Sequence, residues 1–370
     1  MTYNVMVMMM LTFGLVEGIY LYIFISRILK VFIKDNLLLV RCIAIVASVL
    51  IVYFALNIFG ITANVVIHLI VISLIVDIVY LIIKKVKGID PESRGEKIYR
   101  LGIIPMALVA VIMIYGKINM HHIVETDYSI ITSKDMEDLK VALIADIHYP
   151  VSSDGDKIRK TVERIEENEP DILILCGDIV DERSGLEEVQ EVFSILGETK
   201  TKYGIYYVYG NHDRGDYAQE PDFDHAQLEK AILDSGITIL TDSHVEIRDD
   251  VTLLGRQDRS YPRKKIDELL SGIDTNDFIL LADHQPVEFE SNKDAGIDLQ
   301  VSGHTHGGQM WPTGYLITMF GGNDLRYGYK KIDGFQAIVT SGFAGWGYDI
   351  KTGGPAEYVI IDIKSQEEAK

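Results

Sequence analysis

Cysteine is scarce in this chain of 370 residues: Cys42 lies in an apolar run, and Cys176 ends a short strand-like apolar segment. Two isolated cysteines indicate neither a disulfide framework nor a thiolate metal site. Free cysteine is usually a small buried residue, so we interpret both as packing residues. Neither points to function.

Basic residues are missing from the first 26 positions, and Arg27 is the first Lys or Arg. A cleaved signal peptide begins with a basic region, and here three further apolar runs follow the first, so we do not expect cleavage. Each run is close to the roughly 20 residues that a helix needs to cross a bilayer. The four runs cover about residues 4–26, 37–59, 62–83 and 101–116. We therefore predict an all-α membrane region of about four spans at residues 1–120.

The net charge of -19 is unevenly distributed. Residues 1–120 hold 11 Lys/Arg and 6 Asp/Glu (net +5), which leaves 24 and 48 (net -24) for residues 121–370. Binding to a nucleic-acid backbone depends on basic surface, so this acidic second domain is not expected to bind nucleic acid.

Lys and Arg concentrate in alternate loops of the membrane region. They occur between the first and second runs and between the third and fourth, and none lies between the second and third. The positive-inside rule places the two basic loops in the cytoplasm. We predict a multi-pass protein of the cell membrane with an extracytoplasmic domain at residues 121–370.

Three ionisable residues, Glu17, His68 and Asp77, lie within the apolar runs. Charges in hydrocarbon raise the question of a transport path. Hydrogen bonding between helices or a neutral acid is the alternative, and the sequence has no repeat or broken-helix pattern typical of a transporter. We favour this alternative over a transport path.

After a connecting stretch at 117–139, apolar strand-like segments alternate with helical ones near 156–168 and 185–198. This alternation predicts an α/β domain, in which ligands gather at the carboxyl ends of the strands. Five strand-like segments end in polar residues. In order, these ends read Asp146-Ile147-His148, Gly177-Asp178-Ile179-Val180-Asp181, Gly210-Asn211-His212-Asp213, Asp283-His284 and Gly303-His304-Thr305-His306.

These side chains suit divalent metal ions. Residues i and i+2 of an extended segment point the same way, so Asp146 with His148, and His304 with His306, form short chelates. Carboxylate, imidazole and amide oxygen favour Mn, Fe or Zn over soft ions. A single D-x-H motif means little, but five such blocks in this order are improbable by chance.

The ordered blocks resemble the calcineurin-like metallophosphoesterase superfamily over roughly residues 122–364. The stretches Leu281–Pro286 and Gly303–Gln309 are similar to its bacterial membrane-associated branch, which includes phosphodiesterases and UDP-2,3-diacylglucosamine pyrophosphatase-like enzymes. The resemblance implies a metallophosphoesterase-type β-sandwich flanked by helices.

The resemblance also implies the roles of individual residues. One ion would be held by Asp146, His148 and His306, and a second by Asn211, His284 and His304, with Asp178 bridging both. His212 would donate a proton to the leaving oxygen and Asp181 would orient it. Histidine is suited to acid catalysis near neutral pH.

Several residues near these blocks have two interpretations. The branch often has a basic residue late in the chain, where this sequence offers Lys351 instead of a clear Arg. For Asp213 we prefer a cap or turn role. The basic cluster Arg256, Arg259, Arg263, Lys264 and Lys265 is either a phosphate-binding surface or a solvated face. Trp311, Pro312 and Tyr315 form an apolar lip over the site, rest on lipid, or pack in the ordinary way.

Together these features predict a membrane-anchored dinuclear-metal phosphoesterase that hydrolyses phosphodiester or pyrophosphate bonds of a phosphate-ester substrate, lipid-linked or from the envelope. A membrane anchor would hold the domain near such substrates at high effective concentration. The alternative is a non-catalytic membrane sensor or scaffold, and intact ligand blocks argue against it. Natural substrate, metal identity and protein partners do not follow from the sequence.

Overall fold

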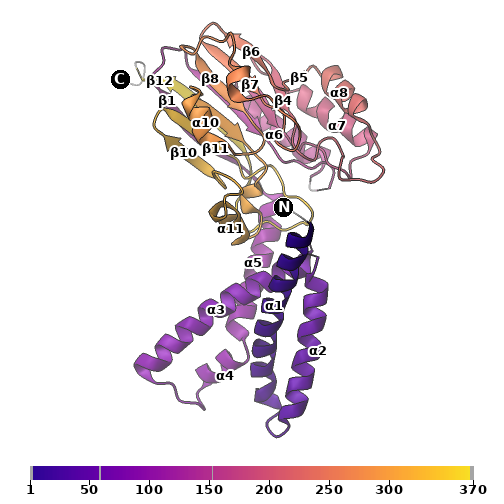
Figure 1. The fold of residues 1–370 in the computed structure, drawn as a ribbon, viewed down its shortest axis with the longest axis vertical. Helices are drawn as coiled ribbons and strands as arrows, with labels where there is room; N and C mark the ends of the chain where they lie inside the picture. The colour runs from indigo at the N-terminus through magenta and orange to yellow at the C-terminus, as the bar shows by residue number, and fades with distance from the viewer. Residues whose placement is uncertain (1–2, 58–59, 152, 367–370) are drawn as a thin grey trace. The chain divides into compact units, whose positions relative to one another are not determined.

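The computed structural model describes residues 3–57, 60–151 and 153–366 (Figure 1), with only the backbone described for residues 3–11. It divides into two compact units, Met1–Gly116 and Lys117–Lys370. The predicted domain boundary after residue 120 stays a prediction. In the structure Met120 is already buried in the core of the second unit, and Asn119 donates hydrogen bonds to the carbonyls of Lys351 and Gly354.

The first unit is helical. Its helices are α1 (Tyr3–Phe32), α2 (Leu37–Ala55), α3 (Ile61–Lys87), α4 (Arg94–Arg100) and most of α5 (Ile103–His121). Helices α2, α3 and α5 are long and apolar enough to cross a membrane, and they match the second to fourth predicted runs. The first run lies in α1, where the side chains up to Leu11 fall outside the described part, as do residues 58–59 of the second run. The total of four spans remains a prediction.

Two of the three ionisable residues singled out above, Asp77 and His68, make hydrogen bonds between and within helices. Asp77 accepts hydrogen bonds from Arg27 (2.5 Å) and Tyr20 (2.9 Å), which lie on another helix. The Nδ1 atom of His68 lies 2.8 Å from the carbonyl oxygen of Asn64 in the same helix. These contacts fit the hydrogen-bonding interpretation.

The second unit is a sandwich of two six-stranded sheets. The first has the order β1-β12-β2-β3-β4-β5 and the second β10-β11-β9-β8-β7-β6. The first sheet consists of β1 (Ile123–Thr132), β2 (Leu139–Ile144), β3 (Ile172–Cys176), β4 (Ile205–Val208), β5 (Thr238–Ile239) and β12 (Ala356–Ser365). The second consists of β6 (Ser243–Arg248), β7 (Val251–Gly255), β8 (Phe278–Ala282), β9 (Leu299–Ser302), β10 (Gly328–Ile332) and β11 (Phe335–Val339).

Side-chain alternation along the strands builds the layers. In β2, Val141 and Leu143 point into the core between the sheets, whereas Ala142 and Ile144 face the helices on the outer side. That outer face is covered by α6 (Gly155–Glu167), α7 (Leu186–Gly197) and α8 (His225–Asp234) (Figure 1). On the other sheet, α9 (Ile266–Leu269) and α10 (Phe289–Asp294) pack over a separate cluster. The predicted fold class, a β-sandwich flanked by helices, is confirmed.

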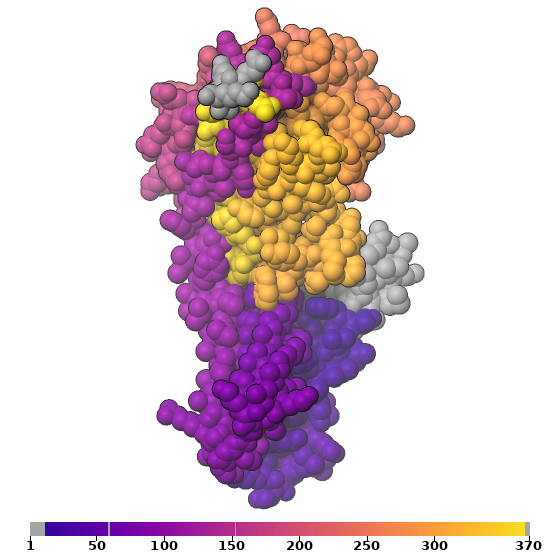
Figure 2. Space-filling view, turned by 90° about the vertical axis from the view of Figure 1, so that its left-hand side faces the viewer, coloured from indigo at the N-terminus to yellow at the C-terminus, as the bar shows by residue number. Residues whose placement is uncertain are grey.

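One strand differs from expectation. We treated 117–139 as a connection, but Ile123–Thr132 forms β1, paired in parallel with β12 from Ile123 opposite Ala356 to Thr132 opposite Ser365. Figure 2 shows this strand beside the yellow C-terminal strand. Its partner is more than 200 residues away in the sequence, so local pattern gives little sign of the pairing.

The parallel neighbours place the predicted site. Strands β2, β3 and β4 are parallel neighbours in one sheet, and β7, β8 and β9 in the other. Parallel strands all run in the same direction, so their carboxyl ends lie at one edge of the sheet. The loops that follow these strands therefore meet at that edge in each sheet.

Candidate metal centre

The loops after β2, β3 and β4 supply the first part of the site. Asp146, His148 and Asp178 are almost fully buried, with at most 1% of each exposed. Asn211 follows β4 and is 7% exposed. The loops are tied to one another, because the N–H groups of Asp146 and His148 donate to the carbonyls of Gly177 and Asp178.

The loops after β8 and β9 supply the rest. The Nδ1 atom of buried His284 lies 2.8 Å from the carbonyl of Cys176, across the sandwich on β3. The N–H of His304 donates to both carboxylate oxygens of Asp146 at 3.0 Å. These two bonds join the ligand loops of the two sheets into one site.

The candidate donors form two groups. In one, donor atoms of Asp146, His148 and His306 all lie within 4.8 Å of one another, and in the other those of Asp178, His284 and His304 do so. Asn211 adjoins the second group, with its Oδ1 2.9 Å from Nδ1 of His304. Asp178 lies between the groups, since its Oδ2 is 3.2 Å from Nε2 of His284 and 3.7 Å from Nε2 of His148. All seven predicted ligands come together.

Buried donor atoms that face one another fit divalent ions at these positions. Nε2 of His284 is buried and faces Oδ2 of Asp178 at 3.2 Å, while its Nδ1 is engaged by a carbonyl. Nε2 of His148 faces Nε2 of His306 at 3.3 Å. Burying such groups is costly unless something compensates them, and carboxylate, imidazole and amide donors are those that borderline divalent ions take.

The electrostatics of the site favour added positive charge. Burial opposes ionisation of Asp178, yet the adjacent imidazoles of His284, His148 and His212 hold its pKa well below the ordinary range. Burial likewise opposes protonation of His284, but the carboxylates of Asp178 and Asp146 raise its pKa well above the ordinary value. Asp178 thus stays ionised beside a protonated His284, a positive charge that a cation in the same place would supply.

Backbone strain accompanies the ligands. Asp146, His148, Asp178, His304 and His306 all have φ between 48° and 70°, a region that non-glycine residues rarely adopt. Such strain persists where the surrounding structure enforces it, typically at functional sites. The backbone at position 303 also comes so close to Asp146 that only glycine fits, because a Cβ atom there would lie 2.8 Å from Oδ2 of Asp146.

The predicted proton donor His212 has a different partner from the one we expected. Its Nδ1 lies 2.8 Å from Oε2 of Glu182, not against Asp181. Asp181 instead bonds Arg183 (2.9 Å) and places Oδ2 3.6 Å from Nδ1 of His148. The two carboxylates are adjacent in sequence, and the turn after β3 directs one to each histidine. Burial lowers the pKa of His212, but Glu182 and the nearby Asp178 outweigh this and raise it.

Asp213 is a turn residue, as we preferred. Its fully buried carboxylate accepts hydrogen bonds from the N–H groups of Asp178, Ile179, Val180 and Gly210, at 2.6–3.1 Å. It therefore fixes the loops that carry Asp178 and Asn211 without reaching into the site.

Comparison with known proteins identifies the domain that holds the candidate ligands. Residues 139–308, which contain all seven candidate ligands, match the family model of the calcineurin-like phosphoesterases. This is a calcineurin-like metallophosphoesterase domain. The prediction of a metal-dependent phosphoesterase domain, made from the ordered sequence blocks, is confirmed.

Relatives include proteins with membrane segments. A metallophosphoesterase of Helicobacter pylori (strain J99) is 30% identical over 241 residues, 63% of this chain and 62% of its own length. A zebrafish (Danio rerio) protein, named transmembrane protein with metallophosphoesterase domain, is 25% identical over 74% of this chain and 65% of its own. The chain thus matches less than two thirds of the length of these two relatives. Like the zebrafish protein, it combines apolar helices with a metallophosphoesterase domain.

A solved structure is also similar. A dimetal phosphatase from Danio rerio covers 54% of this chain and 86% of its own, at 13% identity and a TM-score of 0.38. A likeness at this level decides nothing about the chemistry of the present chain.

In the metallophosphoesterase domain, the side chain of Lys351 points inward rather than toward a substrate. It is fully buried, and its Nζ donates to the carbonyls of Ser341, Gly342 (3.1 Å) and Ala344 (2.9 Å). Burial lowers its pKa to about 7, against the opposing charges of Asp146 and Glu357. Lys351 therefore does not replace a substrate-binding Arg.

The basic cluster is partly structural. Arg256 is 2% exposed and bonds Glu288 (2.7 Å), while Arg263 bonds both Glu288 (2.9 Å) and Asp283 (3.0 Å). Asp283 precedes the candidate ligand His284, so these ion pairs support the ligand loop. These two arginines are already paired with carboxylates and do not form an open phosphate site.

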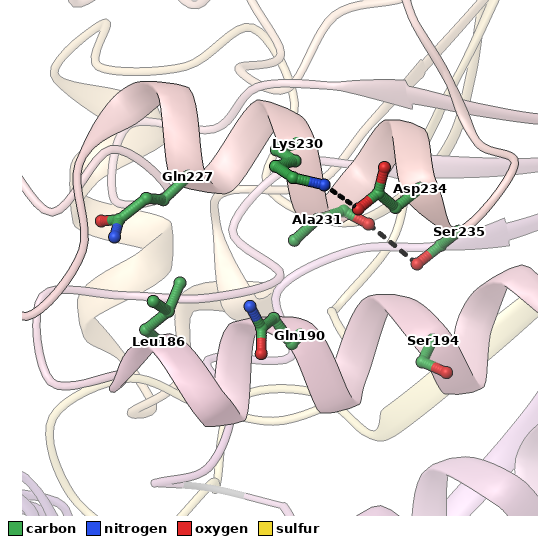
Figure 3. A pocket seen from close by; sticks show the side chains of 8 residues that line it. All are labelled: Leu186, Gln190, Ser194, Gln227, Lys230, Ala231, Asp234 and Ser235. Carbon is green, nitrogen blue, oxygen red and sulfur yellow. Dashed lines mark hydrogen bonds and ion pairs between the residues drawn. The ribbon is translucent and has the colours of Figure 1, made fainter.

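A surface hollow of about 470 Å³ between α7 and α8 lies apart from this chemistry (Figure 3). Lys230 pairs with Asp234, and Ser235 donates to the carbonyl of Ala231. None of the candidate ligands lines it. The hollow is therefore separate from the candidate metal centre.

Proposed function

We propose that this chain is a membrane-anchored dinuclear-metal phosphoesterase that hydrolyses phosphodiester or pyrophosphate bonds of a lipid-linked or envelope substrate. The observation that carries the proposal is the shared position of Asp178, whose Oδ2 lies within 4 Å of a histidine from each donor group. A carboxylate between two three-donor groups is the arrangement that two neighbouring divalent ions need.

The ligand assignment follows the two groups. Asp146, His148 and His306 would hold one ion, Asn211, His284 and His304 the other, and Asp178 both. Mn, Fe and Zn all suit these donors, with manganese among the metals to test first. Two such ions stabilise the charge that develops on attacking and leaving oxygens during phosphoester hydrolysis.

His212 would act as the proton donor. With Nδ1 engaged by Glu182, its Nε2 is the atom left to give a proton to the leaving oxygen. The carboxylate of Glu182 fixes the ring orientation and favours the protonated imidazole. Asp181 lies beside Nδ1 of His148, so it would orient this candidate metal ligand and not the proton donor His212.

The membrane region suggests where the substrate lies. The apolar helices would keep the domain at a bilayer, where lipid-linked phosphates are at high effective concentration. The distribution of Lys and Arg favours four spans and an extracytoplasmic domain. A substrate carried on lipid or in the envelope fits both features.

The test uses the full chain in nanodiscs, stripped of metal and then given Mn, Zn, Fe or Mg, with bis(p-nitrophenyl) phosphate as substrate. Metal-restored turnover that Asp178→Asn and His212→Ala both lose would support the proposal. An exposed control, Asp222→Asn, should leave turnover unchanged. Binding of two ions without turnover by any metal would instead favour a non-catalytic sensor or scaffold.

A further inference from the structure

A short segment beside the metal centre exposes an unusual amount of apolar surface. Helix α11 (Thr313–Met319) and the residue after it carry five exposed large hydrophobic side chains. They are Tyr315 (57% exposed), Leu316 (46%), Ile317 (51%), Met319 (68%) and Phe320 (81%). In the described part of residues 117–366, eleven large hydrophobic side chains are exposed, and these five fall within six consecutive residues.

The segment also lacks charge. The 17 residues from Gly307 to Asn323 contain no Asp, Glu, Lys or Arg, although residues 121–370 contain 72 charged residues in total. A helix that faces water normally carries polar and charged residues on its outer side. Large apolar side chains exposed together on one short segment mark an interaction surface.

Hydrogen bonds connect the start of this segment to the end of a candidate membrane span. The N–H of Trp311 donates to Thr352 (3.1 Å), and the N–H groups of Thr352 and Gly353 donate to the carbonyl of Gln309 (2.7 and 2.9 Å). The same loop, residues 349–354, binds the last turn of α5. Asn119 donates to the carbonyls of Lys351 (2.9 Å) and Gly354 (2.7 Å), and His121 lies 2.6 Å from Asp349.

This connection brings the bilayer within reach of α11. Helix α5 is a candidate membrane span, so its last turn, which belongs to the catalytic unit, lies where the chain leaves the hydrocarbon. One loop bonds both that turn and the residues leading into α11. The exposed apolar segment is thus continuous with the membrane end of the span.

We propose that residues 311–320 form an interfacial anchor that inserts its apolar side chains into the bilayer surface. The pattern is that of an interfacial element: Trp311 and Tyr315 accompany aliphatic residues, and the Arg326 guanidinium lies 4.3 Å from the Tyr315 ring centroid. Attraction to anionic lipid cannot hold this acidic domain, so the contact is apolar. It begins five residues after His306, so the anchor would hold the metal loops near the bilayer surface.

The inference rests on membrane anchoring, and its lipid-substrate consequence rests on the proposed function. The test therefore reads out contact without turnover. In a Cys42→Ser background, Phe320→Cys is labelled with an environment-sensitive fluorophore in the full chain in phosphatidylcholine nanodiscs. Cys176 is fully buried and should not react. Leu233→Cys on α8, where the native side chain is 58% exposed, is the matched control.

Insertion predicts a blue-shifted emission at position 320 and quenching by doxyl-labelled lipid at least about threefold stronger than at position 233. Equal quenching at both positions would overturn the proposal. Shielding at position 320 only in discs that hold two copies of the chain would overturn it in favour of self-association.

A second readout addresses the substrate. Leu316→Glu with Phe320→Glu should lower hydrolysis of a phosphodiester lipid in phosphatidylcholine vesicles by about tenfold, and leave hydrolysis of bis(p-nitrophenyl) phosphate unchanged. Leu233→Glu should change neither rate. Equal loss on both substrates would contradict a lipid-specific role. Because fluorescence needs no turnover, failure of the anchor and failure of the proposed catalysis remain distinguishable.

Discussion

Lys351 and His306 share one acceptor, the carbonyl oxygen of Ala344, which lies 2.9 Å from Nζ of the lysine and 3.3 Å from Nδ1 of the histidine. The shared carbonyl assigns the proton of the neutral imidazole to Nδ1 and leaves Nε2 for the ion-binding group. The buried Nζ atom of Lys351 holds that carbonyl in place through its hydrogen bonds to the 341–344 loop. A lysine that touches no candidate ligand therefore positions one.

Replacing this lysine should weaken metal binding. Lys351→Met removes the donors that fix the 341–344 loop, so the Ala344 carbonyl can move and His306 loses its fixed orientation. Loss of such a supporting contact typically costs 10–100-fold in metal affinity, and we expect at least about tenfold here. Calorimetric titration of the metal-stripped full chain measures this.

The control is Lys331→Met on β10, where the lysine is exposed. It should bind both ions as the native chain does. Unchanged affinity in Lys351→Met would show that the loop keeps its shape without the ammonium.

Glu182 should set the alkaline limit of activity. The proton donor must be protonated, so turnover falls as pH rises through the pKa of His212, which Glu182 helps to raise. Glu182→Gln removes that charge, lowers the pKa, and should move the alkaline limb of the pH profile to lower pH by about one unit. Steady-state rates measured across pH in the native chain and the variant check the shift.

Two variants sharpen this measurement. Glu187→Gln, an exposed neighbour at the start of α7, should leave the profile in place. Asp181→Asn should reduce metal affinity more than it shifts the profile, because Asp181 lies beside His148. A shift with Asp181→Asn but none with Glu182→Gln would restore the original expectation that Asp181 orients His212.

The sequence predicted that the candidate ligands lie together, because each follows a buried strand; their roles as ligands come from the family resemblance and stay a prediction. An apolar run such as Ile172–Cys176, which is buried throughout, is typical of a strand inside a sheet. Because neighbouring strands of this kind are parallel, the loops that follow them lie at one edge of the sheet. Only that rule was needed to bring Asp178 and Asn211 together.

What the sequence could not predict depends on side-chain direction and long-range pairing. Asp181 and Glu182 are adjacent acids, and only the conformation of the turn decides which one meets His212. Lys351 is a surface residue by type, yet three carbonyls and full burial make it internal. The pairing of β1 with β12 joins segments that are far apart in the sequence, and nothing in either segment indicates that the other is its partner.

Removal of the Asp213 carboxylate should destabilise the domain. Asp213→Ala leaves four buried N–H groups without an acceptor, at a cost of about 1–3 kcal/mol for each group that finds no water. We expect a clear drop in the melting temperature of the full chain in nanodiscs, followed by differential scanning fluorimetry. Asp222→Ala, at an exposed position, is the control, and equal melting of the two variants would be inconsistent with this role.

The predicted topology can be tested with single cysteines. In intact cells with Cys42→Ser, Leu233→Cys in the catalytic domain should react with a membrane-impermeant maleimide. Pro91→Cys, in the basic loop before α4, should react only after permeabilisation. The reverse pattern would place the catalytic domain in the cytoplasm.

Gly303 offers the most direct test of ligand geometry, because the backbone fixes where one added methyl group would lie and which atoms it would meet. A Cβ at this position would lie 2.6 Å from Cβ of Ala145 and 2.8 Å from Oδ2 of Asp146, both too close for real contacts. Gly303→Ala must therefore push Asp146 away from His148 and His306, and we expect metal affinity to fall at least about tenfold. At Gly334, a Cβ would meet no atom within 4 Å, so Gly334→Ala should bind metal normally. If Gly303→Ala also binds normally, Asp146 is not held where the ion requires it.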